Sequence, residues 1–155
     1  MRKVVAVTLL GLSLILSGCG ANSHATGNIN GTWSATLSNS TLANLFIFTT
    51  KVTVNADGSL GTTSFDLSLN NTPCSFPSTT ESGSFTITGN FNGQVSGTFH
   101  YVVMSTGSEV NTLTLDGTVS GGEITGTWSV SGATQNCGGS GNFTMTPVLA
   151  PAMGK

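Results

Sequence analysis

The chain has 155 residues and a formal net charge of −2, and only 6% of its residues are charged, against about a quarter in typical soluble domains. The four basic residues are Arg2, Lys3, Lys51 and Lys155. They are too few to neutralise a row of phosphates, which excludes nucleic-acid binding as a main function. The chain contains 20 serines, 25 threonines, 21 glycines and 13 asparagines. This length and composition predict a single domain whose surface is hydrated by uncharged hydroxyl and amide groups.

Residues 1–18 have the pattern of an export signal. Arg2 and Lys3 precede an apolar stretch over residues 4–16, and small residues follow it. As a helix this stretch covers about 20 Å, less than the roughly 30 Å of a bilayer core, so a permanent spanning helix is not expected. We therefore interpret residues 1–18 as a signal peptide.

The four residues Leu16-Ser17-Gly18-Cys19 resemble the lipobox of bacterial lipoproteins. The resemblance implies cleavage after Gly18, a diacylglyceryl thioether on Cys19 and, in many bacteria, a further acyl chain such as palmitate on the new amino terminus. With about 0.8 kcal/mol per buried methylene, two or three chains anchor a domain stably in a membrane. Gly20, rather than an aspartate, follows the cysteine. The resemblance therefore implies the bacterial cell envelope, and the outer membrane where the cell has one.

The two other cysteines form an even pair. With Cys19 bound to lipid, Cys74 and Cys137 remain, and an exported protein lies in a compartment where disulfides persist. A bridge between them would close a loop of about 64 residues and stabilise the fold by roughly 4 kcal/mol. No histidine lies near either cysteine in the sequence, so no metal site is expected here.

The mature chain is predicted to consist of strands. Residues 19–28 are interpreted as the lipidated N-terminus and a flexible tether, and residues 149–155 as a C-terminal tail. Between them, apolar residues alternate with polar ones, which indicates half-buried strands. The alternation predicts eight strands around residues 29–37, 46–54, 65–69, 85–91, 95–103, 113–119, 124–130 and 143–145. No window shows helical periodicity.

The connections between these strands alternate in length. Short glycine-containing turns are expected at 55–58, 90–93 and 120–122, and longer loops at 39–44, 70–82, 105–109 and 132–140. The predicted fold over residues 29–148 is therefore all-β, an eight-stranded antiparallel up-and-down barrel or flattened sandwich with one disulfide. All tight turns would lie at one end, where the tether also leaves, and all longer loops at the other. The bridge would then either cap the barrel or hold it flattened.

Several strands share a Gly-Thr pair in which the glycine falls on the apolar face, at Gly31, Gly97, Gly117 and Gly126. Such glycines leave room for a neighbouring aromatic ring and let a strand coil as barrel closure requires. Gly31-Thr32-Trp33 at the start of the first strand resembles the Gly-any-Trp motif of lipocalin and avidin-like barrels. The resemblance implies eight meander strands, whereas the C-terminal helix of lipocalins and the polar ligand set of avidin-like proteins are not recognisable in this sequence.

No catalytic arrangement is recognisable, and we expect neither an enzyme nor a cofactor. A Gly-any-Ser-any-Gly elbow does not occur, and His100, the one histidine of residues 29–148, is predicted to face outward. The acidic residues are scattered singly, so no glycosidase pair or metal site is expected. Four aromatic side chains are predicted to face inward, where they either line a small apolar pocket or fill the core: Trp33, Phe99, Tyr101 and Trp128.

Two functional hypotheses remain for a membrane-anchored envelope lipoprotein. In the first, the barrel interior binds a small apolar ligand, as in a lipocalin. In the second, the core is solid and the protein meets an envelope partner through its loop end and its Ser/Thr-rich exterior. Outward Thr-any-Thr pairs could contact polysaccharide or protein, although threonine is also an ordinary residue of exposed strands. These pairs are Thr86/Thr88, Thr112/Thr114, Thr125/Thr127 and Thr144/Thr146.

Overall fold

The computed structural model describes residues 29–91 and 94–148. The predicted signal peptide, Cys19, the tether and the C-terminal tail lie outside the described residues. Eight strands and no helix are found in the described residues, which confirms the predicted fold class. The strands are β1 (Gly31–Ser38), β2 (Phe46–Val54), β3 (Leu60–Asn70), β4 (Thr79–Phe91), β5 (Gln94–Ser105), β6 (Asn111–Ser120), β7 (Glu123–Gly132) and β8 (Gly138–Pro147).

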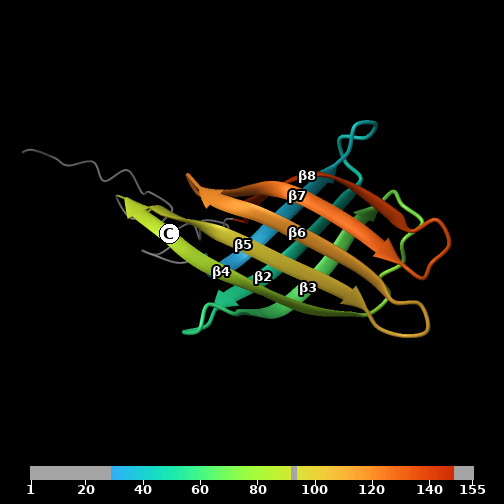
Figure 1. The fold of residues 1–155 in the computed structure, drawn as a ribbon, viewed down its shortest axis with the longest axis horizontal. Coiled ribbons are helices and arrows are strands. Elements are labelled where there is room, and N and C mark those ends of the chain that lie inside the picture. Colours follow the sequence, from blue (N-terminus) through green and yellow to red (C-terminus); the bar gives the residue numbers. More distant parts are fainter. Residues whose placement is uncertain (1–28, 92–93, 149–155) are drawn as a thin grey trace, which may run out of the picture.

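The strands form one antiparallel sheet that closes on itself almost completely. Its order is β3-β2-β1-β8-β7-β6-β5-β4, so the first and last strands of the chain are hydrogen-bonded neighbours. The ladder is interrupted between β3 and β4, and the described residues show one isolated bridge there, between Ser59 just before β3 and Ser84 of β4. Figure 1 shows β4 to β8 in front of β1 to β3, with the two groups of strands crossing at a steep angle. The domain is therefore a nearly closed barrel.

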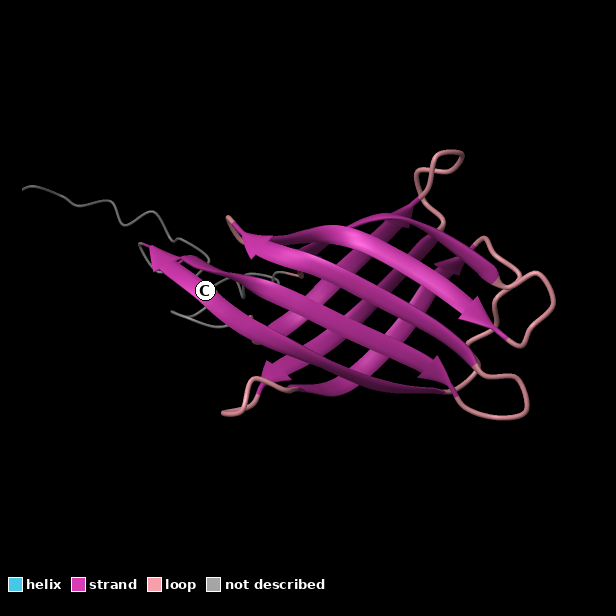
Figure 2. Ribbon diagram, in the orientation of Figure 1, coloured by secondary structure: helices cyan, strands magenta, loops and turns pink. Residues whose placement is uncertain are grey.

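The two ends of the barrel differ as the sequence predicts. Loops at 39–45, 71–78, 106–110 and 133–137 lie at one end, and the turns at 55–59 and 121–122 lie at the other, where β1 begins (Figure 2). Gly121 and Gly122 have φ angles of 62° and 84°, the left-handed conformations that a two-residue hairpin turn needs and that glycine adopts without strain. The predicted turn at 90–93 lies partly outside the described residues.

The expected loop over 70–82 is too long, because β3 and β4 extend into it and leave a connection at 71–78. On β4, the inward positions Thr79, Glu81 and Gly83 lie opposite residues of β5. None of these three is apolar, so the alternation that marks a strand is absent there. The pairing with β5 forms the strand nevertheless.

The core lies between the two groups of crossing strands and consists of their inward side chains. Two of the glycines predicted to make room for aromatic rings do so. A Cβ on Gly97 would lie 2.4 Å from the Phe85 ring, and one on Gly117 would lie 2.8 Å from the Phe143 ring. Gly126 instead faces backbone, because a Cβ there would lie 2.1 Å from the carbonyl oxygen of Asp116.

Candidate functional site

The four aromatic side chains proposed as pocket lining are buried in the core. Tyr101 is 0% exposed, and Trp33, Phe99 and Trp128 are each 2% exposed. Tyr101 lies between two other rings, with centroids 6.4 Å from Phe48 and 6.0 Å from Phe99. All four side chains belong to one hydrophobic cluster of buried residues. Their arrangement is that of a filled barrel interior.

The hydroxyls of Tyr101 and Thr50 form a buried hydrogen-bonded pair in this interior. The Tyr101 hydroxyl lies 3.0 Å from Thr50 Oγ1, and Thr50 Oγ1 donates to the Ser64 carbonyl oxygen at 2.9 Å. Since the threonine proton is used on Ser64, Tyr101 donates and Thr50 accepts. Burial raises the pKa of Tyr101 to about 12, and the carboxylate of Glu81 adds to this effect. The phenol therefore remains neutral and acts as a structural donor.

The loop end of the barrel is covered. The predicted disulfide is confirmed: it joins Cys74 to Cys137, with the two Cα atoms 4.7 Å apart. Cys74 is 1% exposed, and Phe76 of the same loop packs edge-on against Phe46 with ring centroids 6.3 Å apart. The bridge therefore draws the 71–78 loop across the mouth to the 133–137 loop. Of the two roles considered for the bridge, the structure supports the cap.

A buried asparagine holds the same loops together. Asn111 is 0% exposed, and its Nδ2 donates to the Ser75 carbonyl oxygen at 2.8 Å and to Thr134 Oγ1 at 2.7 Å. Its Oδ1 accepts from the Thr134 backbone N–H at 3.2 Å. The sequence places Asn111 next to the predicted strand over 113–119 but gives no indication of these partners, because they come from loops distant in the chain.

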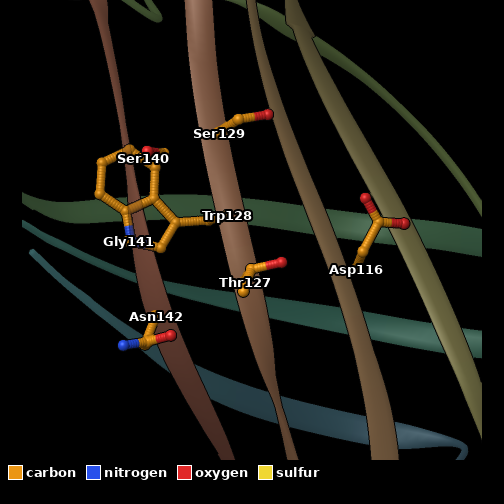
Figure 3. Close-up of a pocket in the computed structure, with 7 residues that line it drawn as sticks. All are labelled: Asp116, Thr127, Trp128, Ser129, Ser140, Gly141 and Asn142. Carbon is orange, nitrogen blue, oxygen red and sulfur yellow. The ribbon is translucent and has the colours of Figure 1, made fainter.

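An open pocket lies on the outer surface, over three neighbouring strands. It has a volume of about 430 Å³, and Figure 3 shows its side chains projecting from β6, β7 and β8. Trp128 lines it from the core side, and its Nε1 donates to the Ser38 carbonyl oxygen at 2.9 Å. The other lining residues are Asp116, Thr127, Ser129, Ser140, Gly141 and Asn142. Sequence reasoning did not single out this group, because only strand pairing brings its members together.

His100 faces outward, as predicted, and pairs with the acid at the edge of this pocket. Its Nδ1 lies 2.6 Å from Asp116 Oδ1 across the β5–β6 ladder, and the two side chains are 46% and 64% exposed. No serine hydroxyl is hydrogen-bonded to His100 in the described part of the chain. The pair therefore positions the Asp116 carboxylate, and the arrangement has no activated nucleophile.

The described residues contain no group of three His, Cys, Asp or Glu side chains placed to hold a metal ion. None of the described segments forms a helix long and apolar enough to cross a membrane. Comparisons with protein-family models, with curated proteins and with solved structures found no match to this chain.

Proposed function

We propose that this chain is a non-enzymatic lipoprotein of the bacterial cell envelope, anchored through lipid on Cys19, that acts through the outer surface of a solid barrel. The packed interior supports the second hypothesis, in which the core is solid, because all four candidate lining aromatics are at most 2% exposed. The covered mouth supports the same choice, since Cys74 and Phe76 pack over the loop end. A ligand would have to displace this packing.

The anchor is proposed from the sequence Leu16-Ser17-Gly18-Cys19. The full chain, expressed in a bacterium fed an alkyne fatty acid, should carry the label and begin at Cys19. Cys19→Ser should abolish the label. Cys74→Ser is the matched control, because it removes a different cysteine and should leave lipid attachment unchanged. An unlabelled wild-type chain would refute the anchor.

The solid interior is tested separately by native mass spectrometry of the full processed protein in detergent. The expected mass is that of the lipidated, disulfide-bonded chain alone, before and after unfolding. A small molecule that is bound in the native state and lost on unfolding would overturn this part of the proposal in favour of a carrier. The two experiments are independent, because lipid attachment does not depend on what the barrel contains.

A further inference from the structure

Strand pairing aligns threonines into a row across the outer face. Five outward threonines lie directly opposite one another on five adjacent strands, and Thr36 on β1 extends the row. Neighbouring strands are about 4.8 Å apart, so the row places one hydroxyl and one methyl group at regular intervals. From β4 to β8 its members are Thr86, Thr98, Thr118, Thr125 and Thr144. We call this set the threonine row.

The open pocket lies directly beside the threonine row. One outward position closer to the loop end lies a second row of residues on β5 to β8. In this row His100 lies opposite Asp116, Asp116 opposite Thr127, and Thr127 opposite Asn142. Ser129 and Ser140, also opposite each other, form the far side of the pocket. The threonine row and the pocket thus form one continuous polar surface over β6, β7 and β8.

The hydroxyls of this surface are available to a ligand. Within residues 29–91 and 94–148, the side chains of the threonine row make no hydrogen bond to another protein group. The same holds in these ranges for Thr127, Ser129, Ser140 and Asn142. Asp116 differs, because His100 holds its carboxylate at 2.6 Å and leaves oxygen lone pairs to accept further hydrogen bonds. The surface therefore offers donors and acceptors side by side.

The chemistry of the surface restricts the partner. Lys51 is the single lysine or arginine within residues 29–148 and lies on β2, so this face has no lysine or arginine for nucleic acid or another polyanion. Energetically dominant residues of protein interfaces are mostly Trp, Tyr and Arg, with Ser and Thr under-represented. Ile87, an exposed apolar residue, directly follows Thr86 on β4, whereas exposed Met104 lies past the pocket along β5.

We propose that this surface binds a neutral polysaccharide chain that lies across the strands, with a sugar ring in the pocket. This inference rests on the proposed function, in which the exterior is the working surface. Sugar hydroxyls both donate and accept, which matches Ser, Thr and Asn side chains, and the carboxylate of Asp116 accepts from them.

The test is retention of the full processed protein, in detergent and with its disulfide intact, on insoluble cellulose and chitin, with heparin resin as the anionic comparison. Thr118→Val and Thr125→Val each remove a hydroxyl of the threonine row and keep the branched shape. Thr49→Val is the matched control, because Thr49 faces outward on β2, away from this surface. One lost hydrogen bond of about 1 kcal/mol corresponds to about fivefold weaker binding.

The expected result is retention on at least one neutral polysaccharide, weakened about fivefold by each variant of the threonine row and unchanged by Thr49→Val. Asn142→Ala should weaken retention similarly, and far-UV circular dichroism should show that every variant is folded. Retention on neither polysaccharide overturns the inference, as does preferential retention on heparin or equal loss with Thr49→Val. Fatty-acid labelling of the same preparation reports whether the proposed anchor stands, independently of glycan binding.

Discussion

Tyr101 allows the filled interior to be tested through stability. Replacing it with phenylalanine removes the hydroxyl that donates to Thr50, while Thr50 Oγ1 still donates to the Ser64 carbonyl oxygen. The Thr50 hydroxyl keeps its acceptor, so we expect a loss near neutral pH of about 1 kcal/mol in the free energy of unfolding. A much larger loss would indicate that the ring itself has shifted.

The wild-type protein should also lose stability in alkali. The pKa of Tyr101 is about 12 in the folded protein, against about 10 in an unfolded chain. The unfolded state therefore releases the proton first. The stabilisation is complete below about pH 10 and is lost as the pH rises through about 12, in total roughly 2–3 kcal/mol. Tyr101→Phe should lack this decline, whereas contributions from other alkaline groups remain in both proteins.

The measurement is urea unfolding at a series of pH values from about 8 to about 12, followed by circular dichroism. Tyr101 is the only tyrosine of the chain, so the ultraviolet absorbance of tyrosinate reports its ionisation directly. Ionisation near the ordinary tyrosine pKa in the folded protein would refute the conclusion that this hydroxyl is buried. Parallel pH profiles for wild type and Tyr101→Phe would refute the linkage.

Two further predictions concern the cap and the close approach of β8 to β1. Replacing Cys74 and Cys137 with alanine should lower the free energy of unfolding by roughly 4 kcal/mol. The 71–78 loop should also become more accessible to protease. A loss of unfolding free energy below about 1 kcal/mol would show that the bridge does little to hold the loop. Gly141→Ala would place a Cβ 1.9 Å from the Ser38 carbonyl oxygen and should lower the free energy of unfolding by about 1–3 kcal/mol. Gly138→Ala is its control, because the nearest atom to its Cβ would be 3.9 Å away, and equal stabilities of the two variants would contradict the packing argument.

Strand prediction depended on how apolar the inner face of each strand is. The alternation around Trp128 in β7 is clear, since inward positions are apolar and outward ones polar. At the start of β8, Gly139 and Gly141 occupy inward positions, and the sequence shows no alternation. The structure explains Gly141, because a Cβ there would lie 2.9 Å from Trp128 Nε1 and closer still to the Ser38 carbonyl oxygen, whereas a Cβ on Gly139 would make an ordinary contact with the Trp128 ring at 3.5 Å.

The sequence by itself determined the all-β class, the eight strands, the two unlike ends and the pairing of Cys74 with Cys137, because alternation and cysteine parity are local or countable properties. The tertiary structure alone decided that the barrel is nearly closed, that its ladder is interrupted between β3 and β4, and that the four candidate aromatic side chains are buried. It also decided that Asp116, Thr127 and Asn142 share one surface. Such neighbours depend on strand register, and a shift of one residue in register would turn every outward side chain of a strand inward.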